Sequence, residues 1–159
     1  MEVRILDVIF YGLLVLAADQ LSKYIIRANM EPHESLPIIK GIFHITYVQN
    51  TGAAFSILQG KTYFFTIVSL AIILAIIFFL RKVPPEKRLL RFVMALVLGG
   101  AAGNLIDRFR FGYVVDFFDF RIWPVFNIAD SAIVVGVIIL AYLIAFDPGF
   151  SGQYGKSGR

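Results

Sequence analysis

Four long apolar runs dominate the pattern of hydrophobic and polar positions along the chain. They cover about residues 5–26, 63–80, 89–106 and 126–146. Each run is close to the roughly 20 residues that a helix needs to cross the hydrocarbon core of a bilayer. The runs are too long and too unbroken for barrel strands, and a spanning backbone must satisfy its hydrogen bonds internally. We therefore predict an all-α membrane protein with four transmembrane helices in a single domain.

The connection of about residues 28–61 shows a different pattern. Residues 41–48 are rich in β-branched and aromatic side chains, residues 50–52 (Asn-Thr-Gly) have turn chemistry, and the chain is apolar again up to Leu58. This pattern is typical of a short hairpin. We predict a small extracytoplasmic β-cradle over about residues 41–58, lying at the membrane surface.

Composition supports the membrane assignment and narrows the chemistry. The chain is 58% hydrophobic and 16% charged, whereas a soluble domain has about 25% charged residues. With no cysteine and only His33 and His44 as imidazoles, thiol catalysis is excluded and a zinc site is disfavoured. We predict no metal and no cofactor. Residues 151–159 are rich in Ser and Gly and are predicted to form a disordered tail.

The basic residues indicate an orientation in the membrane. They gather at the ends of the apolar runs and not on one face, which argues against a nucleic-acid partner. The densest cluster lies in the short link between the second and third runs: Arg81, Lys82, Lys87, Arg88 and Arg91. The positive-inside rule places this link in the cytoplasm. Four spans then place both termini in the cytoplasm, and residues 28–61 and 107–125 face outward.

Two carboxylates are the first candidates for chemistry. Asp116 lies in an apolar stretch of the second outward connection, and Asp130 lies about one turn into the fourth run. Pro124 between them allows a chain reversal that brings the two side chains together. Two carboxylates at close range in low dielectric share a proton, so that one acts as a base on water and the other as an acid. In this interpretation Asp130 is the base.

A structural interpretation of the same residues stands beside the catalytic one. Asn127 and Asp130 have the spacing of a helix capping box, and Asp116 alone is compatible with a loop carboxylate among headgroups. Capping and catalysis are compatible, because a helix N-terminus favours the ionised form that a base needs. The pattern alone leaves both interpretations open.

Two further pairs have the i, i+4 spacing of a single helix face. Asp19 and Lys23 lie inside the first run, which is too long for the apolar core of a signal peptide. They form either an ion pair that lipid tolerates or a brace for an active site. Asn104 and Arg108 lie at the outward end of the third run. Arg108 either reaches headgroups or holds a substrate phosphate or carbonyl, and Asp107 is expected to neutralise it.

Smaller features complete the set of candidate residues. Asn50 and Gly52 form a turn or, in the functional interpretation, Asn50 binds a peptide. Gly99 and Gly103 predict close helix packing, and Trp123 is a candidate interface anchor. The remaining polar residues of the outer connections are interpreted as surface groups: His44, Asp119 and Arg121.

The residues leave two other classes of protein open. A small transporter subunit would use Asp19 and Lys23 as ion relays, and a membrane scaffold would use the Gly99–Gly103 face as a dimer seam. Transport requires polar groups across the whole bilayer, whereas those of this sequence gather at one end of the predicted bundle. A scaffold leaves Asp116 and Asp130 without a role.

Five motifs, in this order, resemble those of one known family. They are DQLSK at residues 19–23, NTGAAF at 50–55, GGAAGNLIDR at 99–108, VVDF at 114–117 and FNIAD at 126–130. Each motif is weak alone, but together and on four spans they are similar to the lipoprotein signal peptidases, the type II signal peptidases of bacteria. The similarity extends over most of the chain.

The resemblance implies an intramembrane aspartyl endopeptidase that activates water. Such an enzyme removes the signal peptide from a diacylglyceryl-modified prolipoprotein, just before the lipidated cysteine. The resemblance implies that Asp116 and Asp130 are the catalytic pair. It also places six further residues at the site: Asp19, Lys23, Asn50, Asn104, Arg108 and Asn127. We add Gly52 of the NTGAAF motif to this set.

The resemblance also carries expectations about partners and location. The substrate would be a lipidated prolipoprotein, membrane phospholipid would surround the protein, and the cyclic peptide antibiotic globomycin would inhibit it. We expect a monomer in the bacterial cytoplasmic (inner) membrane, with the active site near the outer face.

Overall fold

The computed structural model describes residues 3–52 and 60–146. Four long helices make up most of this part of the chain: α1 (Val3–Asn29), α2 (Thr62–Leu80), α3 (Arg88–Phe111) and α4 (Ile128–Phe146). Each is long and apolar enough to cross a membrane, and a small antiparallel sheet accompanies them. The predicted fold class is confirmed. The predicted tail, residues 151–159, lies outside the described residues.

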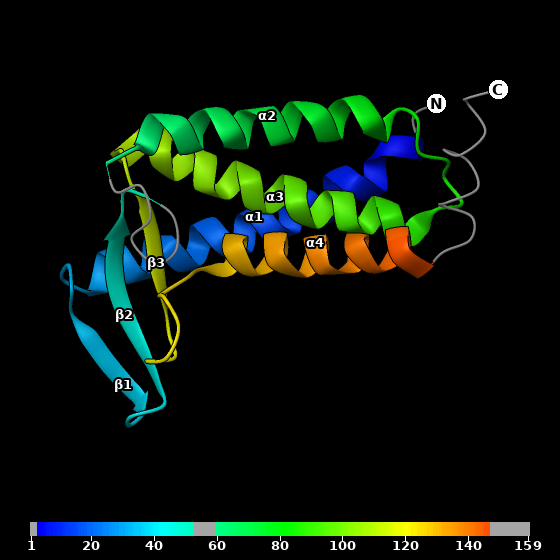
Figure 1. Cartoon of the computed structure of the whole chain (residues 1–159). Helices are drawn as coiled ribbons and strands as arrows, with labels where there is room; N and C mark the ends of the chain where they lie inside the picture. The colour runs from blue at the N-terminus through cyan, green and yellow to red at the C-terminus, as the bar shows by residue number, and fades with distance from the viewer. Residues whose placement is uncertain (1–2, 53–59, 147–159) are drawn as a thin grey trace.

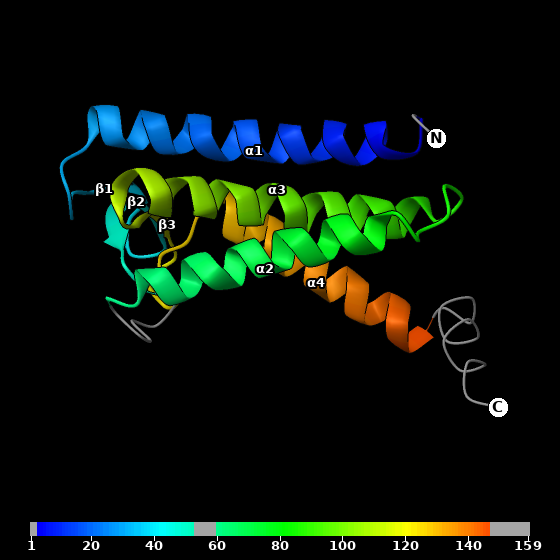
Figure 2. The same ribbon diagram turned by 90° about the horizontal axis from the view of Figure 1, so that it is seen from above.

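The helices lie side by side, with α3 in the centre of the bundle (Figures 1 and 2). α3 contacts each of the other three helices. Of the 18-residue apolar stretch of α3, 61% is buried, whereas only 6% of the corresponding stretch of α2 is buried. The other helices therefore turn most of their apolar side chains outward, where only lipid can solvate them without cost.

Glycines allow α3 to approach its neighbours at backbone distance. A Cβ on Gly99 would lie 2.5 Å from the carbonyl oxygen of Gly12 in α1. A Cβ on Gly100 would lie 2.5 Å from the carbonyl oxygen of Ala129 in α4. The predicted small-residue packing face is confirmed, and it serves two partner helices at once. Gly103 continues this face and leaves room for the side chain of Asp19.

The sheet contains three antiparallel strands in the order β1 (Ser35–Ile39), β2 (Phe43–Asn50) and β3 (Val114–Asp119). Residues 43–50 of the predicted segment form β2, and its described partners are β1 and β3. The observed hairpin turns between β1 and β2, where Gly41 takes the left-handed φ of 78° that favours glycine. β2 then pairs with β3 from the second connection. Residues 53–58 of the predicted segment lie outside the described residues.

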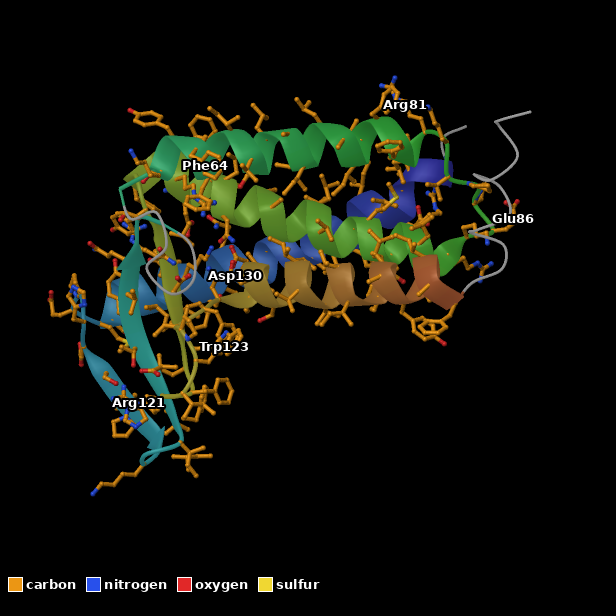
Figure 3. The ribbon with its side chains drawn as sticks, in the orientation of Figure 1. Phe64, Arg81, Glu86, Arg121, Trp123 and Asp130 are labelled. Carbon is orange, nitrogen blue, oxygen red and sulfur yellow. The ribbon has the colours of Figure 1, made fainter. Side chains whose placement is uncertain are left out.

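The two ends of the bundle differ in structure. The sheet lies at one end, beside the end of α1 and the start of α4, and we call this the sheet end (Figure 1). The start of α1, the 81–87 link and the end of α4 lie at the other end, which we call the loop end (Figure 1). Asp130 and Trp123 lie at the sheet end, whereas Arg81 and Glu86 lie at the loop end (Figure 3).

Candidate active site

Asp130 occupies the first turn of α4 and forms the predicted capping box. The backbone amide of Asp130 donates to Asn127 Oδ1 at 2.8 Å, and the amide of Asn127 donates to Asp130 Oδ2 at 3.3 Å. The two bonds satisfy amides that a helix start otherwise leaves without partners. The α4 N-terminus also favours negative charge at this position. The capping interpretation of Asp130 is therefore confirmed.

Asp116 lies in the middle of β3 and is 1% exposed. Its two carboxylate oxygens accept hydrogen bonds from Asn50 Nδ2 and Asn127 Nδ2, each at 2.7 Å. Burial, reinforced by the nearby charge of Asp130, raises the pKa of Asp116 to about 8. Asp116 is therefore mostly protonated at neutral pH. It is not a loop carboxylate among headgroups, and that interpretation is wrong.

Asn127 and Asn104 join the two carboxylates into one network (Figure 3 shows where Asp130 lies). Asn127 is fully buried, and its side chain contacts Asp116 while its backbone amide contacts Asp130. Asn104 Nδ2 donates to Asp130 Oδ1 at 2.8 Å, and Asn104 Oδ1 accepts from Asn127 Nδ2 at 3.2 Å. The side chains of Asp116 and Asp130 are thus held around a single residue.

Lys23 supports this network from the interior of the bundle. Its ammonium lies 2.9 Å from Asp19 Oδ2, 2.9 Å from Asp107 Oδ2 and 3.0 Å from Asn104 Oδ1. Since an ammonium only donates, this contact requires that Asn104 turn its oxygen to Lys23 and its amide nitrogen to Asp130. The predicted Asp19–Lys23 ion pair is confirmed. It also lies one contact away from the carboxylate pair.

Asp107 has a different role from the one that the sequence suggested. The prediction that Asp107 neutralises Arg108 is wrong, because Asp107 turns inward, is 1% exposed and binds Lys23. Its Oδ2 also accepts the backbone amide of Val115 at 3.0 Å, which ties α3 to β3 next to Asp116. The i, i+3 and i, i+4 spacings of α3 contain no sign of this contact.

Gln20 is a further site residue that sequence reasoning missed. Its side-chain amide donates to Asp107 Oδ1 at 3.0 Å and to the carbonyl oxygen of Gly103 at 3.2 Å. Asp19 Oδ1 accepts the backbone amide of Ala129 at 2.9 Å, so α1 also positions the start of α4. Gln20 stands in the DQLSK motif beside two candidates, and that position was the available signal.

A pocket of about 610 Å³ opens onto the two carboxylates. Asp116 and Asp130 both line it, together with apolar side chains of the 123–126 loop and of α4. Arg108 lies in its wall, where its guanidinium donates to Ser69 Oγ at 3.3 Å and lies 5.5 Å from the Phe65 ring. Arg108 therefore faces the pocket and α2, which does not support the headgroup interpretation.

Asn50 and Gly52 enter the pocket from the end of β2. Asn50 Oδ1 accepts the amide of Gly52 at 2.9 Å, so the predicted local turn is present. The other end of the same side chain binds Asp116. This contact is possible because the β2–β3 register places Val48 opposite Asp116 and Asn50 opposite Val114. The turn interpretation of Asn50 is confirmed, whereas its binding of a peptide stays a prediction.

Asp119 departs from its prediction as a surface group. It is 4% exposed and accepts hydrogen bonds from Thr46 Oγ1 at 2.7 Å and from the Arg121 guanidinium at 2.8 Å. These hydrogen bonds outweigh the effect of burial and lower its pKa. Arg121 is exposed, as expected, and His44 is half-buried against Ser35. Asp119 stabilises the sheet and does not line the pocket.

The site is fully hydrogen-bonded and draws on all four helices and the sheet. Within residues 3–52 and 60–146, no buried side-chain nitrogen or oxygen lacks a partner. Every residue that the sequence placed at the site lies in the pocket wall or in the network behind it: Asp19, Lys23, Asn50, Gly52, Asn104, Arg108, Asp116, Asn127 and Asp130.

Comparison with known proteins identifies the family. The model of one family, Signal peptidase (SPase) II, matches residues 11–146, which include every residue of the site. The chain belongs to the signal peptidase II family. Members of this family are aspartic peptidases, so the chain is an enzyme. Its four apolar helices make it a multi-pass membrane protein. The transporter and scaffold hypotheses are thereby set aside.

Individual relatives agree with the family assignment. The chain is 58% identical over 142 residues to the lipoprotein signal peptidase of Moorella thermoacetica, covering 89% of this chain and 95% of the relative. It is 44% identical over 142 residues to that of Bacillus subtilis, covering 87% and 92%. A solved bacterial membrane enzyme matches with a TM-score of 0.80 and 36% identity, covering 96% of this chain and 92% of that one.

Proposed function

We propose that this signal peptidase II family member removes the signal peptide from lipidated prolipoproteins and that Asp116 and Asp130 carry the reaction. One observation supports this above all: both carboxylates line the same pocket, and the single residue Asn127 hydrogen-bonds to both. Carboxylates remote in sequence that share one pocket and differ in protonation are the requirement for aspartic proteolysis.

The surroundings of the two carboxylates support different roles for them. The raised pKa of Asp116 keeps a proton on it at neutral pH, so it is the acid of the resting enzyme. Asp130 accepts two hydrogen bonds, from Asn104 and from the amide of Asn127, at the start of a helix. Asp116 also accepts two hydrogen bonds, but only Asp130 lies at a helix N-terminus, which favours the carboxylate form, and we therefore assign Asp130 as the base.

The reaction follows from these roles. Asp130 takes a proton from a water molecule, whose oxygen then forms a bond to the scissile carbonyl carbon. Asp116 gives its proton to the carbonyl oxygen, which produces a neutral tetrahedral intermediate. When the C–N bond breaks, Asp130 returns its proton to the leaving amine and Asp116 recovers a proton from the intermediate. The products are the carboxylic acid of the signal peptide and the free amine of the lipidated cysteine.

The walls of the pocket suit a substrate confined to the bilayer. Apolar side chains from α4 and the 123–126 loop provide a surface for lipid chains. Arg108 has guanidinium donors facing the same pocket, and we assign it to the carbonyl oxygens of the bound peptide. Gly52 lines the pocket as well, with no side chain to obstruct an approaching backbone.

The orientation and partners are part of the same proposal. The basic 81–87 link lies at the loop end, so the positive-inside rule places that end, with the start of α1 and the end of α4, in the cytoplasm. The catalytic dyad, Asp116 and Asp130, then faces the outer side of the bacterial inner membrane. The enzyme acts as a monomer surrounded by phospholipid, and globomycin inhibits it.

The decisive experiment is cleavage of a diacylglyceryl prolipoprotein by the purified chain, with and without globomycin. Asp116→Asn and Asp130→Asn should each abolish cleavage while the protein still inserts into the membrane. Asp119→Asn is the matched control, because this buried carboxylate lies on the same strand outside the pocket and should leave cleavage near the wild-type rate. Cleavage at the wild-type rate by either dyad variant would refute the assignment.

A further inference from the structure

A second pocket, of about 600 Å³, lies at the loop end of the bundle. Its walls come from residues 7–11 of α1, residues 88–92 of α3 and Pro85 of the link between α2 and α3. It is remote from the carboxylate pair, because Arg81 and Glu86 lie at the loop end whereas Asp130 lies at the sheet end (Figure 3). None of the residues that carry the proposed peptidase reaction lines it. The pocket therefore needs an explanation of its own.

The floor of the pocket is an ion pair between the buried Arg91 and the partly exposed Asp7. Arg91 is 1% exposed and donates from Nε to Asp7 Oδ2 at 2.9 Å, and a second nitrogen of the guanidinium donates to Asp7 Oδ1. One turn along, the rings of Tyr11 and Phe92 meet edge to face, with centroids 5.2 Å apart. These contacts hold α1 against α3 and neutralise Asp7, so the floor does not repel an anion.

The rim of the pocket is cationic. Arg88 is the first residue of α3 and its side chain is exposed. Within the part of the chain that the structure describes, no carboxylate pairs with its guanidinium. The 81–91 segment holds five basic residues and a single acidic one. Apolar groups border the same opening, since Tyr11 is 42% exposed and Leu89 is 48% exposed.

We propose that this pocket binds the headgroup of an anionic phospholipid from the leaflet at the loop end. The guanidinium of Arg88 holds the phosphate through charge-assisted hydrogen bonds. The acyl chains run along the exposed apolar side chains of α1 and α3, beginning at Tyr11 and Leu89. Basic pockets between spans at a basic membrane surface suit such lipids, whereas a free phosphate would gain nothing from the apolar border.

The test is lipid retention by the full-length protein. The protein is purified in detergent, supplied with phosphatidylglycerol or phosphatidylcholine, and its bound lipids are counted by native mass spectrometry. We expect phosphatidylglycerol to be retained preferentially and Arg88→Gln to weaken its binding about tenfold or more, since a charge-assisted bond is lost. Arg81→Gln is the matched control, because it removes the same charge from the same segment outside the pocket. Its effect should not exceed about fivefold.

The possible outcomes separate a built site from general surface charge. Equal effects of Arg81→Gln and Arg88→Gln, or equal retention of the two lipids, would overturn the proposal. Displacement of the lipid by millimolar inorganic phosphate would also overturn it, because it would show a simple anion site. Arg88→Gln should leave prolipoprotein cleavage unchanged, which separates this proposal from that of the peptidase reaction.

Discussion

Lys23 permits a quantitative test of how the site is held together. Its ammonium contacts Asp19, Asp107 and Asn104, and all four side chains are at most 5% exposed. Lys23→Met removes the charge but retains much of the apolar stem. Two buried carboxylates then face each other without a cation. The loss of one partner from a buried pair costs about 3–5 kcal/mol, and two abandoned partners place the expected loss at the upper end.

The assay is reversible unfolding in mixed micelles, with sodium dodecyl sulfate as the denaturant and far-UV circular dichroism as the signal. Adding Asp19→Asn and Asp107→Asn to Lys23→Met should recover most of the lost free energy of unfolding, because neutral amides need no counterion. Lys82→Met is the control: Lys82 is exposed at the loop end and its removal should leave stability nearly unchanged. Cleavage by folded Lys23→Met should be weakened but not abolished, because Lys23 reaches Asp130 only through Asn104.

Two results would refute this reasoning. A loss below about 1 kcal/mol for Lys23→Met would mean that water reaches the two carboxylates, since exposed ion pairs contribute about that much or less. A triple variant no more stable than Lys23→Met would mean that packing, and not charge, is the contribution of Lys23.

Further predictions concern the protonation of the dyad and the packing behind it. Because the acid form of Asp116 is lost as pH rises through its pKa of about 8, kcat/KM should fall about tenfold per pH unit above that value; a flat profile up to pH 10, with unchanged circular dichroism, would contradict the assignment of Asp116 as the acid. Gly100→Ala places a Cβ 2.5 Å from the Ala129 carbonyl oxygen, displaces the turn that carries Asp130, and should cost about 1–3 kcal/mol of stability and most of the activity. The control is Gly12→Ala, whose Cβ meets nothing closer than 3.6 Å; similar losses in both variants would show that the close approach of α3 to α4 is not the cause.

The sequence predicted most accurately where the interaction is local. The Asn127–Asp130 capping box and the Asp19–Lys23 ion pair depend on spacings of three and four residues, which a helix converts directly into contact. The four helices follow from the length of the apolar runs. Runs of this length are too long for barrel strands, and a helix satisfies its backbone hydrogen bonds internally in lipid. The remaining candidate residues were predicted because the five motifs resemble those of a known family.

Interactions between distant segments were decided by the tertiary structure. Whether Asp107 turns toward Arg108 or toward Lys23 depends on where α1 lies, and α1 approaches because of the glycines of α3. In the same way, the pairing of β2 with β3 depends on whether the second outward connection reaches the edge of β2 that β1 does not occupy. Asp116 and Asp130 share a pocket only because β3 pairs with β2 while α4 packs on α3. Helix geometry sets the spacing of residues one turn apart, whereas the meeting of remote side chains depends on how whole elements pack. A local pattern such as the glycines of α3 predicts a close approach but does not specify which elements meet.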